Sequence, residues 1–410
     1  MERYSEYKDS GVKWLGEIPS HWEVMPIKYI SEVSSGATPK TSVQGYWDGN
    51  ITWVTPADFK TETKFVLKGN RNITTLGVKS CSTVILPKGS LVFSKRAPIG
   101  QVSILKIPLC TNQGCFGIIP NESMNNSFLY YSLAIHAQSF NTLGSGTTFR
   151  ELSFSTFSSF KISVPPKEEQ DAIVRYLDAA TSKIDKAIAM QQKMIDLLNE
   201  RKQIIIQNAV TKGLDENVEM KDSGVEWIGM IPKHWKIIRI KHLAKLQSGS
   251  NLTSNEISDT GSYPVYGGNG LRGFYGSYNC EGSYVLIGRQ GALCGNINYA
   301  EDKFWATEHA VVCYPKKKYN TLWFGEVLRL MDLGQYSLAS AQPGLAVERI
   351  KGLYMPYPSI EEQNKIALFL KQNIGKIDLY ARHCQRQIAL LQERKQIIIN
   401  EVVTGKVKVS

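Results

Sequence analysis

Two segments of this chain each occur twice, and the repetition limits what the chain can fold into. Lys8–Lys28 agrees with Lys221–Lys241 at 13 of 21 positions, and Glu168–Thr211 agrees with Glu361–Thr404 at 21 of 44 positions. A repeat of this kind is typical of a duplicated structural unit, so each copy must fit an equivalent setting. We call the first repeated segment the head. The chain therefore has the order head, variable block and second repeated segment, followed by the same order again.

The second repeated segment predicts a long helix. Prolines precede both copies, and paired glutamates then fall in the first turn, where they suit the helix dipole. Apolar residues recur at heptad spacing, with one weaker layer at Gln191 and Cys384. The predicted seam consists of Ile184, Leu198, Ile205, Ile377, Leu391 and Ile398.

One such helix alone would expose its apolar stripe, but two similar stripes can cover one another. We therefore predict that the two segments pair as an antiparallel coiled coil within one chain. The alternative is that each helix packs on its own neighbouring block. A helix break is expected near Thr181-Ser182 and near Ile374-Gly375. About 30 residues would follow each break, and they would span about 45 Å at ~1.5 Å per residue.

The variable blocks differ in sequence but share an outline of short apolar runs separated by Gly, Asn and Pro. This pattern is typical of short strands in a mostly antiparallel or mixed sheet, with modest helices near Ser127–Ala137 and Thr321–Met331. A shared Gly-Ser start aligns Arg96 with Arg289. The predicted fold class is α+β, with two pseudo-symmetric α/β domains separated by two long helical regions that form an antiparallel coiled coil. The predicted divisions are 1–164, 165–215, 216–357 and 358–410.

Composition and charge narrow the class of protein. Hydrophobic residues make up 42% and charged residues 21%, as in a soluble globular protein. No apolar run is long enough to span a bilayer and no N-terminal signal segment is present, so we expect a cytoplasmic location and no membrane contact. The seven cysteines include no Cys-x-x-Cys pair, which predicts buried free thiols and no metal site. The net charge of +11 favours a polyanionic partner.

No linear motif for catalysis is present. The sequence lacks the phosphate-binding loop G-x-x-x-x-G-K-[ST], the nucleophile pattern G-x-S-x-G and the zinc pattern H-E-x-x-H. Gly268–Gly273 satisfies G-x-G-x-x-G, but turn formers and aromatics follow where a dinucleotide site requires a helix, so we interpret it as a loop with glycine hinges. We therefore expect no catalytic and no metal-ligating residue. A site assembled from distant residues is the alternative.

Basic and amide side chains in the loops of the blocks are candidates for DNA contact. Arg and Lys can form two hydrogen bonds with guanine, and Asn and Gln can do so with adenine. For each candidate the alternative is an ordinary surface residue, or a turn-stabilising one for Asn and Gln. The predicted DNA-binding residues are Lys95, Arg96, Asn112, Gln113, Arg150, Asn269, Arg272, Arg289, Gln290, His309 and Gln342. The head residues Trp14, Trp22, Trp227 and Trp235 are expected in the core, with base stacking as the alternative.

Together these features resemble the DNA specificity subunit of type I restriction-modification systems, over essentially the whole chain. The head carries the pattern K-D-S-G-x-x-W-x-G-x-I-P-x-H-W, and the helices begin with P-x-x-E-E-Q and continue to ERKQIII. The first block contributes SGATPKTSVQGYWDGNITWVTPADF, and the second contributes YPVYGGNGLRGFYG and then LIGRQGALCGN. The combination is specific, whereas each part alone would be weaker.

The resemblance implies two target recognition domains, in 1–164 and 216–357, that each read one half of a bipartite asymmetric DNA target with an unread spacer. It implies that the helices hold the readers at a fixed separation, and that two modification and two restriction subunits dock on the chain. Those partners would use S-adenosylmethionine to methylate adenine N6, and ATP and Mg²⁺ to translocate and cleave foreign DNA. This chain would itself hold no cofactor and carry out no catalysis. The alternatives are a structural coiled-coil scaffold and a self-sufficient DNA-modifying enzyme.

Overall fold

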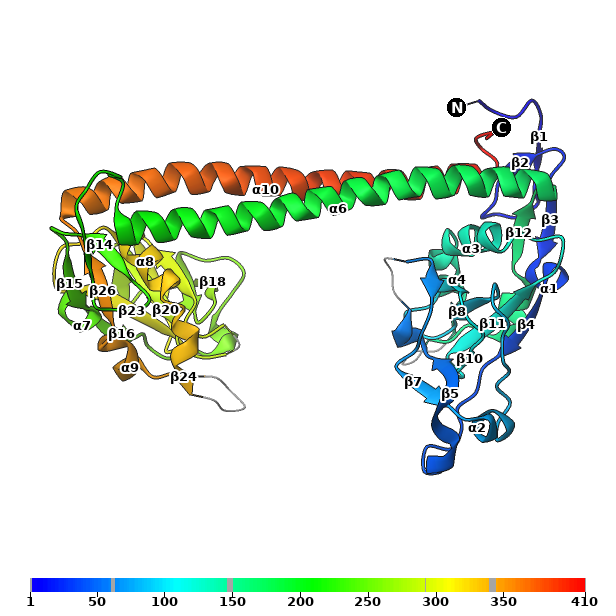
Figure 1. The fold of residues 1–410 in the computed structure, drawn as a ribbon, viewed down its shortest axis with the longest axis horizontal. Helices are drawn as coiled ribbons and strands as arrows, with labels where there is room; N and C mark the ends of the chain where they lie inside the picture. Colours follow the sequence, from blue (N-terminus) through cyan, green and yellow to red (C-terminus); the bar gives the residue numbers. More distant parts are fainter. Residues whose placement is uncertain (1, 60–62, 146–149, 292, 339–343, 410) are drawn as a thin grey trace. The chain divides into compact units, whose positions relative to one another are not determined.

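The computed structural model of the chain describes residues 2–59, 63–145, 150–291, 293–338 and 344–409. The chain divides into two compact units, drawn in Figure 1. Unit 1 consists of Met1–Met190 and Gln387–Ser410, and unit 2 consists of Gln191–Arg386. Each unit contains one head, one variable block and part of each long helix. Within the described ranges, no helix is long and apolar enough to cross a membrane.

Unit 1 has a small head and a mixed β block. In the head, β1 (Tyr7–Asp9) pairs with β2 (Glu17–Pro19), and β3 (Glu23–Pro26) pairs with β12 (Lys161–Val164), both antiparallel. The larger sheet of the block contains, in spatial order, β4 (Ser31–Ser35), β11 (Cys115–Pro120), β8 (Leu91–Ser94), β9 (Val102–Leu105) and β6 (Phe65–Val66). The smaller sheet contains β10 (Cys110–Thr111), β5 (Trp47–Val54) and β7 (Arg71–Ile73). The helices are α1 (Ile27–Ile30), α2 (Thr75–Lys79), α3 (Asn126–Ala134), α4 (Ala137–Leu143) and α5 (Phe154–Ser159).

Unit 2 repeats this plan. Its head contains the antiparallel pairs β13 (Met220–Asp222) with β14 (Met230–Pro232) and β15 (Lys236–Arg239) with β26 (Tyr354–Tyr357). One sheet contains β16 (Ala244–Ser248), β23 (Ala310–Pro315), β20 (Tyr284–Gly288) and β21 (Ile297–Ala300). The other contains β18 (Gly270–Tyr275), β17 (Tyr263–Gly267), β22 (Lys303–Ala306) and β19 (Cys280–Glu281). A short pair, β24 (Ser337–Leu338) with β25 (Gly344–Leu345), and the helices α7 (Ile240–Leu243), α8 (Thr321–Leu330) and α9 (Val347–Lys351) complete the unit.

The strand pairing confirms that the two blocks share one frame, but it corrects the alignment of their loops. Ser94 of β8 pairs with Cys115, and Gly288 of β20 pairs with Ala310. The residue that follows β8 is therefore equivalent to the residue that follows β20, which matches Lys95 with Arg289. The expected match of Arg96 with Arg289 is wrong, because both strands begin directly after their Gly-Ser pair but β20 is one residue longer than β8.

The head tryptophans do not all lie in the core. Trp22 and Trp235 are fully buried, as predicted. Trp227 is partly buried against the core of unit 2. Trp14 is 41% exposed: its ring stacks on Phe160 with centroids 4.7 Å apart, and its Nε1 donates to the Lys161 carbonyl at 3.0 Å. The core prediction is therefore wrong for Trp14, which covers the end of α5 from outside.

The cysteines are free thiols, and five of the seven are buried as predicted. Cys81 and Cys294 are only partly buried, so the expectation of buried thiols is wrong for these two.

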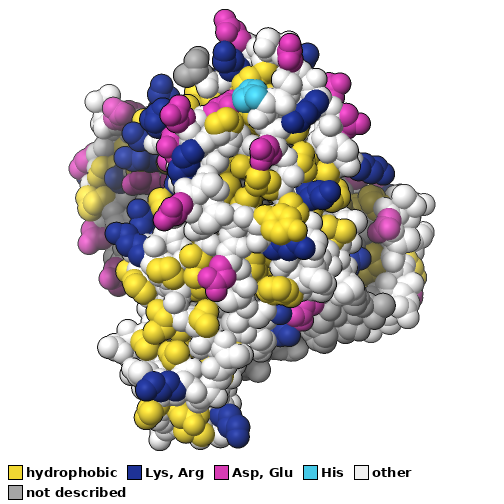
Figure 2. All heavy atoms as spheres, turned by 90° about the vertical axis from the view of Figure 1, so that its right-hand side faces the viewer, with side chains coloured by type: hydrophobic (Ala, Val, Ile, Leu, Met, Phe, Trp, Pro, Cys, Tyr) yellow, Lys and Arg dark blue, Asp and Glu magenta, His cyan; other side chains and the backbone are white. Residues whose placement is uncertain are grey.

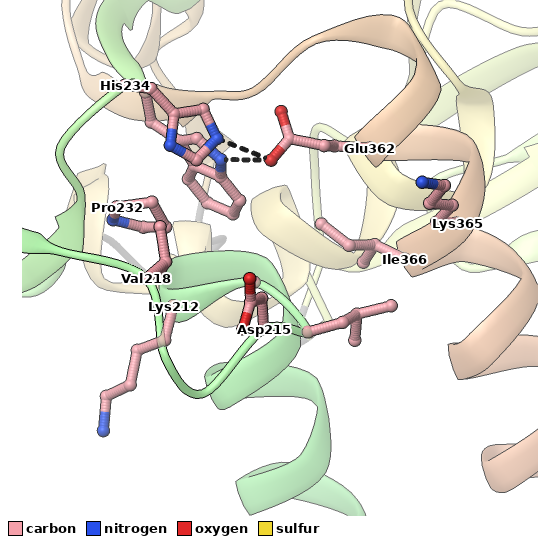
Figure 3. A pocket seen from close by; sticks show the side chains of 11 residues that line it. Lys212, Asp215, Val218, Pro232, His234, Glu362, Lys365 and Ile366 are labelled. Carbon is pink, nitrogen blue, oxygen red and sulfur yellow. Dashed lines mark hydrogen bonds and ion pairs between the residues drawn. The ribbon is translucent and has the colours of Figure 1, made fainter.

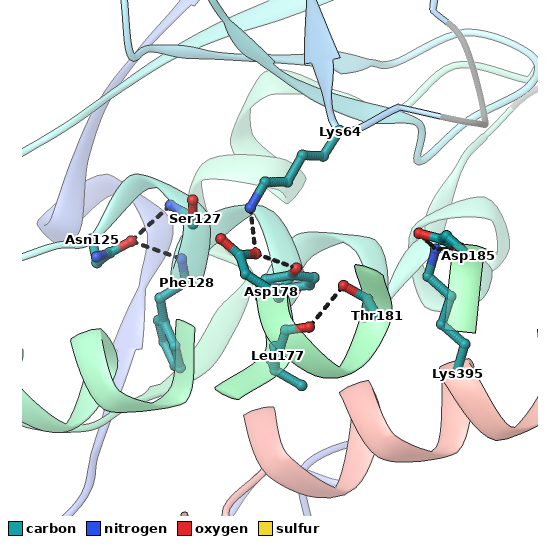
Figure 4. Close-up of polar contacts among 10 residues, drawn as sticks. Lys64, Asn125, Ser127, Phe128, Leu177, Asp178, Thr181, Asp185 and Lys395 are labelled. Carbon is teal, nitrogen blue, oxygen red and sulfur yellow. Dashed lines mark hydrogen bonds and ion pairs between the residues drawn. The ribbon is translucent and has the colours of Figure 1, made fainter. Parts of the chain in front are cut away.

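The long helices are continuous. α6 spans Lys167–Lys212 and α10 spans Ile360–Val403. The predicted breaks near Thr181-Ser182 and Ile374-Gly375 are therefore wrong. The Thr181 hydroxyl donates to the Leu177 carbonyl one turn earlier at 2.7 Å, so it shares the acceptor of its own helical turn and the helix continues (Figure 4). Gly375 costs about 1 kcal/mol relative to alanine in a helix interior, which tertiary packing over a helix of this length can outweigh.

α6 and α10 pack together as an antiparallel coiled coil. Asp185 in the first half of α6 contacts Lys395 in the last third of α10 at 2.6 Å, and the equivalent pair, Asp378 and Lys202, contacts at 2.8 Å. Ile184 and Ile377 of the predicted seam are buried. The other predicted seam residues, Leu198, Ile205, Leu391 and Ile398, are partly buried. Steps of three and four residues link the covered positions from 184 to 209 and from 377 to 402, and both lysines fall on this stripe.

The repeated glutamate ties each head to the start of a long helix. In unit 1, Glu169 accepts from Trp22 Nε1 at 3.2 Å, and its Oε2 lies 2.9 Å from His21 Nε2. In unit 2, Glu362 accepts from Trp235 Nε1 at 2.9 Å and lies 2.8 Å from His234 Nε2. The second half of the head motif, His-Trp, is thus explained by one carboxylate that holds both side chains.

The repeated glutamine ties each block to the same helix start. Gln170 is buried, accepts from the Asn125 backbone N–H at 2.8 Å and donates to the Pro165 carbonyl at 2.9 Å. Asn125 in turn caps α3 by accepting from the backbone N–H groups of Ser127 and Phe128 (Figure 4). In unit 2, Gln363 accepts from the Asn320 N–H at 2.9 Å, and Asn320 caps α8.

Further contacts join the block of unit 1 to α6, and one group of them is centred on Asp178. Asp178 accepts from Tyr131 Oη at 2.6 Å and forms an ion pair with Lys64 (Figure 4). Burial, together with the hydrogen bond to Asp178, raises the pKa of Tyr131 well above its usual range. Tyr131 therefore stays protonated and remains a donor to the helix.

The Glu362 contacts predict a stability that depends on acid pH. Partial burial tends to raise the pKa of Glu362, but hydrogen bonds from Trp235, His234 and Ser359 outweigh it and lower the pKa to about 2. A carboxyl whose folded pKa is depressed stabilises the fold above its ordinary pKa of about 4.3 and loses this contribution as pH falls towards the folded pKa. Glu362→Gln should therefore lower the midpoint of thermal unfolding at pH 7, and its difference from wild type should shrink between about pH 4.5 and pH 2.

The matched control is Glu361→Gln, because Glu361 is an exposed neighbour in the same first turn. This variant should track wild type across the acid range. A Glu362→Gln difference that stayed constant from pH 7 to pH 2 would contradict the role of the carboxylate.

Candidate nucleic-acid interface

Three loops of unit 1 converge beside the end of β8. The Lys95 N–H donates to the Gly114 carbonyl at 2.9 Å, and the Leu152 N–H donates to the Lys95 carbonyl at 2.9 Å. These bonds join the loop after β8, the turn between β10 and β11, and the segment before α5. Lys95, Arg96, Asn112, Gln113 and Arg150 were predicted as DNA-binding residues from separate parts of the sequence, and the structure brings them together here. We call this set of loops cluster 1.

Two cations of cluster 1 are already paired with an acid. Lys95 Nζ and Arg96 Nε each lie 2.9 Å from a different carboxylate oxygen of Glu151. Burial would raise the pKa of Glu151, but hydrogen bonds and charge from Lys95 and Arg96 outweigh it and hold the pKa below its usual range. Lys95 is largely enclosed, whereas Arg96 and Arg150 are exposed. The exposed arginines are therefore better placed for an outside contact than Lys95 is.

The two amide candidates in the turn between β10 and β11 have different roles. Asn112 Oδ1 accepts from the Gly114 N–H at 2.9 Å, which is the turn-stabilising alternative stated above. Gln113 is exposed at the tip of the turn, and its Oε1 accepts from the Thr38 hydroxyl. The turn thus presents Gln113 outward on a fixed backbone.

Unit 2 has an equivalent set of loops, which we call cluster 2. The Arg289 N–H donates to the His309 carbonyl at 2.8 Å, and the Leu345 N–H donates to the Arg289 carbonyl at 2.8 Å. The hairpin turn between β17 and β18, which holds the GNGLRG sequence, also belongs to this cluster. A side chain at Gly288 would lie 2.0 Å from the Gly268 carbonyl oxygen, so only glycine lets the hairpin approach β20 this closely. The expected glycine-hinged loop is thus a β-hairpin turn packed against the cluster.

The predicted residues of cluster 2 have unequal environments. Arg289 Nη1 donates to the Ser248 hydroxyl at 3.2 Å, and Asn269 Oδ1 accepts from Asn296 Nδ2 at 3.1 Å. Gln290 and Arg272 are exposed, and Arg272 lies on β18 beside the hairpin turn. His309 Nε2 lies 3.0 Å from Glu308 Oε1. Gln342, the last predicted residue, lies outside the described residues.

Glu308 was missed by sequence reasoning. Thr111 and Ala306 end parallel strands, and the next N–H in each case donates across the strand pair, to Val54 and Tyr266 respectively. Glu308 follows the end of its strand by two residues, as Gln113 does in unit 1, so the two residues are equivalent. Its Oε2 is shielded from solvent and has no hydrogen-bond partner within the part of the chain that the structure describes. The shared polar-then-apolar runs after this turn were visible in the sequence, but the one-residue shift hid the equivalence.

Arg71 is a second residue that the sequence did not single out. It lies on β7, is exposed, and its guanidinium stacks over the Trp47 ring at 3.6 Å. Charge is otherwise mixed on the face shown in Figure 2, where Lys and Arg side chains lie among Asp and Glu side chains. Among the described residues, no group of three or more His, Cys, Asp or Glu side chains could hold a metal ion.

Comparison with known proteins shows which family shares this architecture. The model of the type I restriction modification DNA specificity domain matches residues 19–194 and 232–388. The chain is 36% identical over 256 residues to the specificity subunit of type I restriction enzyme MjaIX from Methanocaldococcus jannaschii, a match that covers 62% of this chain and 58% of that protein. It is 30% identical over 370 residues to the EcoprrI specificity subunit from Escherichia coli, which covers 85% of this chain and 86% of that protein.

Two solved structures share the fold. A chain solved in work on complex assembly and conformational transition of the type I R-M system matches with a TM-score of 0.74 at 14% identity, over 95% of this chain and 99% of that chain. The HsdS subunit from Thermoanaerobacter tengcongensis matches with a TM-score of 0.53 at 15% identity, over 95% of this chain and 98% of that chain. Duplicated heads, two mixed β blocks and self-paired long helices thus define a fold class that specificity subunits share. This chain belongs to the type I restriction modification DNA specificity family.

The close approach of the hairpin turn to β20 predicts that Gly288 is sensitive to substitution. Gly288→Ala would force its methyl group against the Gly268 carbonyl and should cost about 2 kcal/mol, in the range of overpacked sites. Hydrogen exchange should be faster at the amides of cluster 2, above all at Arg289 and Leu345. The control is Gly276→Ala, because a side chain at Gly276 would meet no atom within 4 Å. Equal stability of the two variants would contradict the packing argument.

Proposed function

We propose that this chain reads a bipartite, asymmetric DNA target, with cluster 1 reading one half-site and cluster 2 reading the other. The observation that carries the proposal is the pair of equivalent turns that present unlike side chains, Gln113 in unit 1 and Glu308 in unit 2. Gln can form two hydrogen bonds with adenine in the major groove, and Glu can accept from the N4 amino group of cytosine. The same backbone frame can therefore address two different sequences.

Other residues of the clusters fit supporting roles. Arg96, Arg150, Arg272 and Gln290 are exposed and have the chemistry to contact base edges or phosphates. Lys95 and Arg289 anchor their loops through Glu151 and Ser248, so they act mainly by fixing loop geometry. The net charge of +11 supplies attraction to the phosphate backbone that is independent of sequence.

We further propose that the chemistry belongs to partner chains that this subunit directs to the target. The duplicated heads and helices provide two equivalent surfaces, which suits two copies of one partner. Two modification subunits would bring S-adenosylmethionine for adenine-N6 methylation, and two restriction subunits would bring ATP and Mg²⁺ for translocation and cleavage. This chain would hold none of these cofactors and would act in the cytoplasm, where foreign DNA is met.

The assembled complex gives the direct test. The chain, with its modification partners, is incubated with random duplex oligonucleotides, and bound sequences are recovered. Two fixed half-sites separated by an unread spacer support the proposal, and recovery of no consensus would favour a structural scaffold. The purified chain alone should not methylate or cleave DNA when S-adenosylmethionine and Mg²⁺ are supplied, because a positive result would favour a self-sufficient enzyme.

Substitution at the two equivalent turns should affect one half-site each. Gln113→Ala should relax discrimination in one half-site only, and Glu308→Ala in the other only, each by roughly 5- to 150-fold at one base pair, because a two-bond contact discriminates by about 1–3 kcal/mol. Binding to oligonucleotides with single-base changes measures the effect. Controls are Gln385→Ala and Glu393→Ala on exposed positions of α10. Loss of discrimination at both half-sites in one variant would contradict independent readers.

The coiled coil should set the spacer. Inserting one heptad into both α6 and α10 adds about 10 Å of helix at ~1.5 Å per residue, or roughly three base pairs at ~3.4 Å each. The selected spacer should lengthen by that amount while both half-site sequences stay the same. Inserting the heptad into α6 alone serves as the control, because it takes the paired stripes out of register and should destabilise the protein. Unchanged spacer length with altered half-sites would contradict the role of the helices.

A further inference from the structure

In each unit, the glutamate at the start of the long helix and the histidine and tryptophan of the head form a trio. In unit 1, where the trio is Glu169, His21 and Trp22, a tyrosine lies beside it. Tyr4 is 9% exposed and donates to Glu169 Oε1. Its ring lies edge-on to Trp22 with centroids 5.9 Å apart, and 5.6 Å from the His21 ring. Tyr4 therefore covers the point where the carboxylate, the imidazole and the indole meet. Burial, and then the hydrogen bond to Glu169, raise the pKa of Tyr4 far above its usual range, so its hydroxyl remains a donor.

Unit 2 has the trio without the tyrosine. The Ser20 N–H donates to the Glu6 carbonyl, and the equivalent Lys233 N–H donates to the Glu219 carbonyl, which fixes the register of the two heads. In this register Asn217 stands where Tyr4 stands in unit 1. Asn217 is exposed, and its N–H donates to Asp215 Oδ1 at 3.0 Å within the turn that follows α6. The turn therefore carries this position away from the trio.

A cavity of about 310 Å³ opens at the uncovered trio. Its walls are Pro232, His234, Trp235, Ile366 and the turn after α6, and Glu362 faces it beside His234 (Figure 3). A cavity of this size accommodates an aromatic side chain, and ligand pockets are commonly lined in this way by apolar groups with a few polar ones. The geometry of unit 1 shows which kind of group such a trio accepts.

We propose that this cavity seats an aromatic side chain from an acidic segment of a partner protein, in the place that Tyr4 takes in unit 1. The aromatic part follows from the Tyr4 arrangement and from the edge that Trp235 offers. The occupant needs no hydroxyl, because Glu362 Oε2 already accepts from Ser359 Oγ at 2.9 Å and from the Ser359 N–H at 3.2 Å. Position 359 corresponds to Pro166 in unit 1, where Tyr4 supplies the missing donor.

The acidic character follows from the rim. Lys212 and Lys365 lie on opposite sides of the cavity and are exposed (Figure 3). Their equivalents in unit 1 are Gly405 and Ala172, so unit 1 has no lysine at these two positions. Asp215 is the one exposed acid among the residues that line the cavity. The Glu362 carboxylate lies further in and is hydrogen-bonded to His234, Trp235 and Ser359, so carboxylates that flank the inserted ring would meet Lys212 and Lys365 at the rim.

This site would make one end of the chain different from the other. Tyr4 covers Trp22 at the equivalent place in unit 1, so the ring of a partner segment would reach the indole in unit 2 and not in unit 1. The proposal goes beyond DNA reading and does not depend on it, because the site lies on the head and helix and not on cluster 2.

The test uses the full chain and p-cresol, the side chain of tyrosine, as the probe. The indole N–H signal of Trp235 is assigned in a ¹⁵N spectrum by its loss in Trp235→Phe. Titration with p-cresol should shift this signal with saturation at millimolar concentration, on the order expected for a ligand of so few atoms, and should leave the Trp22 signal unchanged. Tyr4→Ala should make the Trp22 signal respond as well, because it opens the equivalent place.

Val218→Trp is the matched variant, because Val218 is only partly buried and lines the cavity, so a large ring at this position would take up its volume. It should abolish the p-cresol shift at Trp235 while the fold is kept. No saturable shift at Trp235 in wild type, with a clear shift at Trp22 in Tyr4→Ala, would overturn the proposal. A Trp235 shift that persisted in Val218→Trp would place p-cresol outside the cavity and would also overturn it.

The acidic character is tested with two peptides, acetyl-Asp-Tyr-Asp-amide and acetyl-Lys-Tyr-Lys-amide. The acidic peptide should bind at least fivefold more tightly, and Lys212→Ala with Lys365→Ala should remove most of this preference while leaving p-cresol binding unchanged. Equal affinity for the two peptides in wild type would overturn the assignment of an acidic partner segment.

Discussion

One carboxylate in each half of the chain holds the fold together. Glu169 and Glu362 each bind the indole and the imidazole of a head. The next residue, Gln170 or Gln363, accepts from the backbone N–H of the asparagine that caps α3 or α8. Head, block and long helix therefore meet within two consecutive side chains. Because these residues sit at the start of a continuous helix, any tilt of the helix would have to break several partly buried hydrogen bonds at once, which is costly. The loops that differ between the units are thus held in place by the same Glu-Gln pair in both units.

The sequence alone predicts the structural features that occur twice in the chain. The two heads, the two long helices, their antiparallel pairing and the mixed sheets follow from identity at spaced positions and from heptad spacing, because these patterns report on packing that occurs twice. The Glu-Glu-Gln motif was correctly placed in a first turn, but its role was read as helix-dipole compensation. Its partners, Trp22 and Asn125, lie 147 and 45 residues away along the chain, and spacing alone does not reveal such contacts.

Prediction from the sequence fails where a single residue determines the local structure. The expected helix breaks assumed that a hydroxyl or a glycine stops a helix, whereas the Thr181 hydroxyl bonds within its own helix and Gly375 is carried by its neighbours. The match of Arg96 with Arg289 failed because a strand is extended by a single residue, which changes which side chain stands at the loop. The same shift concealed Glu308 as the counterpart of Gln113. Loop clusters depend on such single-residue differences, so candidate base contacts are the part of the chain least accessible to pattern reasoning.

The contact between Gly405 and Trp22 has a consequence for biosynthesis. A side chain at Gly405 would lie 3.2 Å from the Trp22 ring, and Val402 and Val403 belong to the same apolar cluster as Trp22. The first head to leave the ribosome therefore waits for the last turn of the last helix before its indole is covered. The second head is covered from before by Gly213 and the end of α6, and from after by the start of α10, where Glu362 binds Trp235. The second head therefore needs synthesis only as far as the start of α10, whereas the first head, although made earlier, is completed only after translation has passed residue 405.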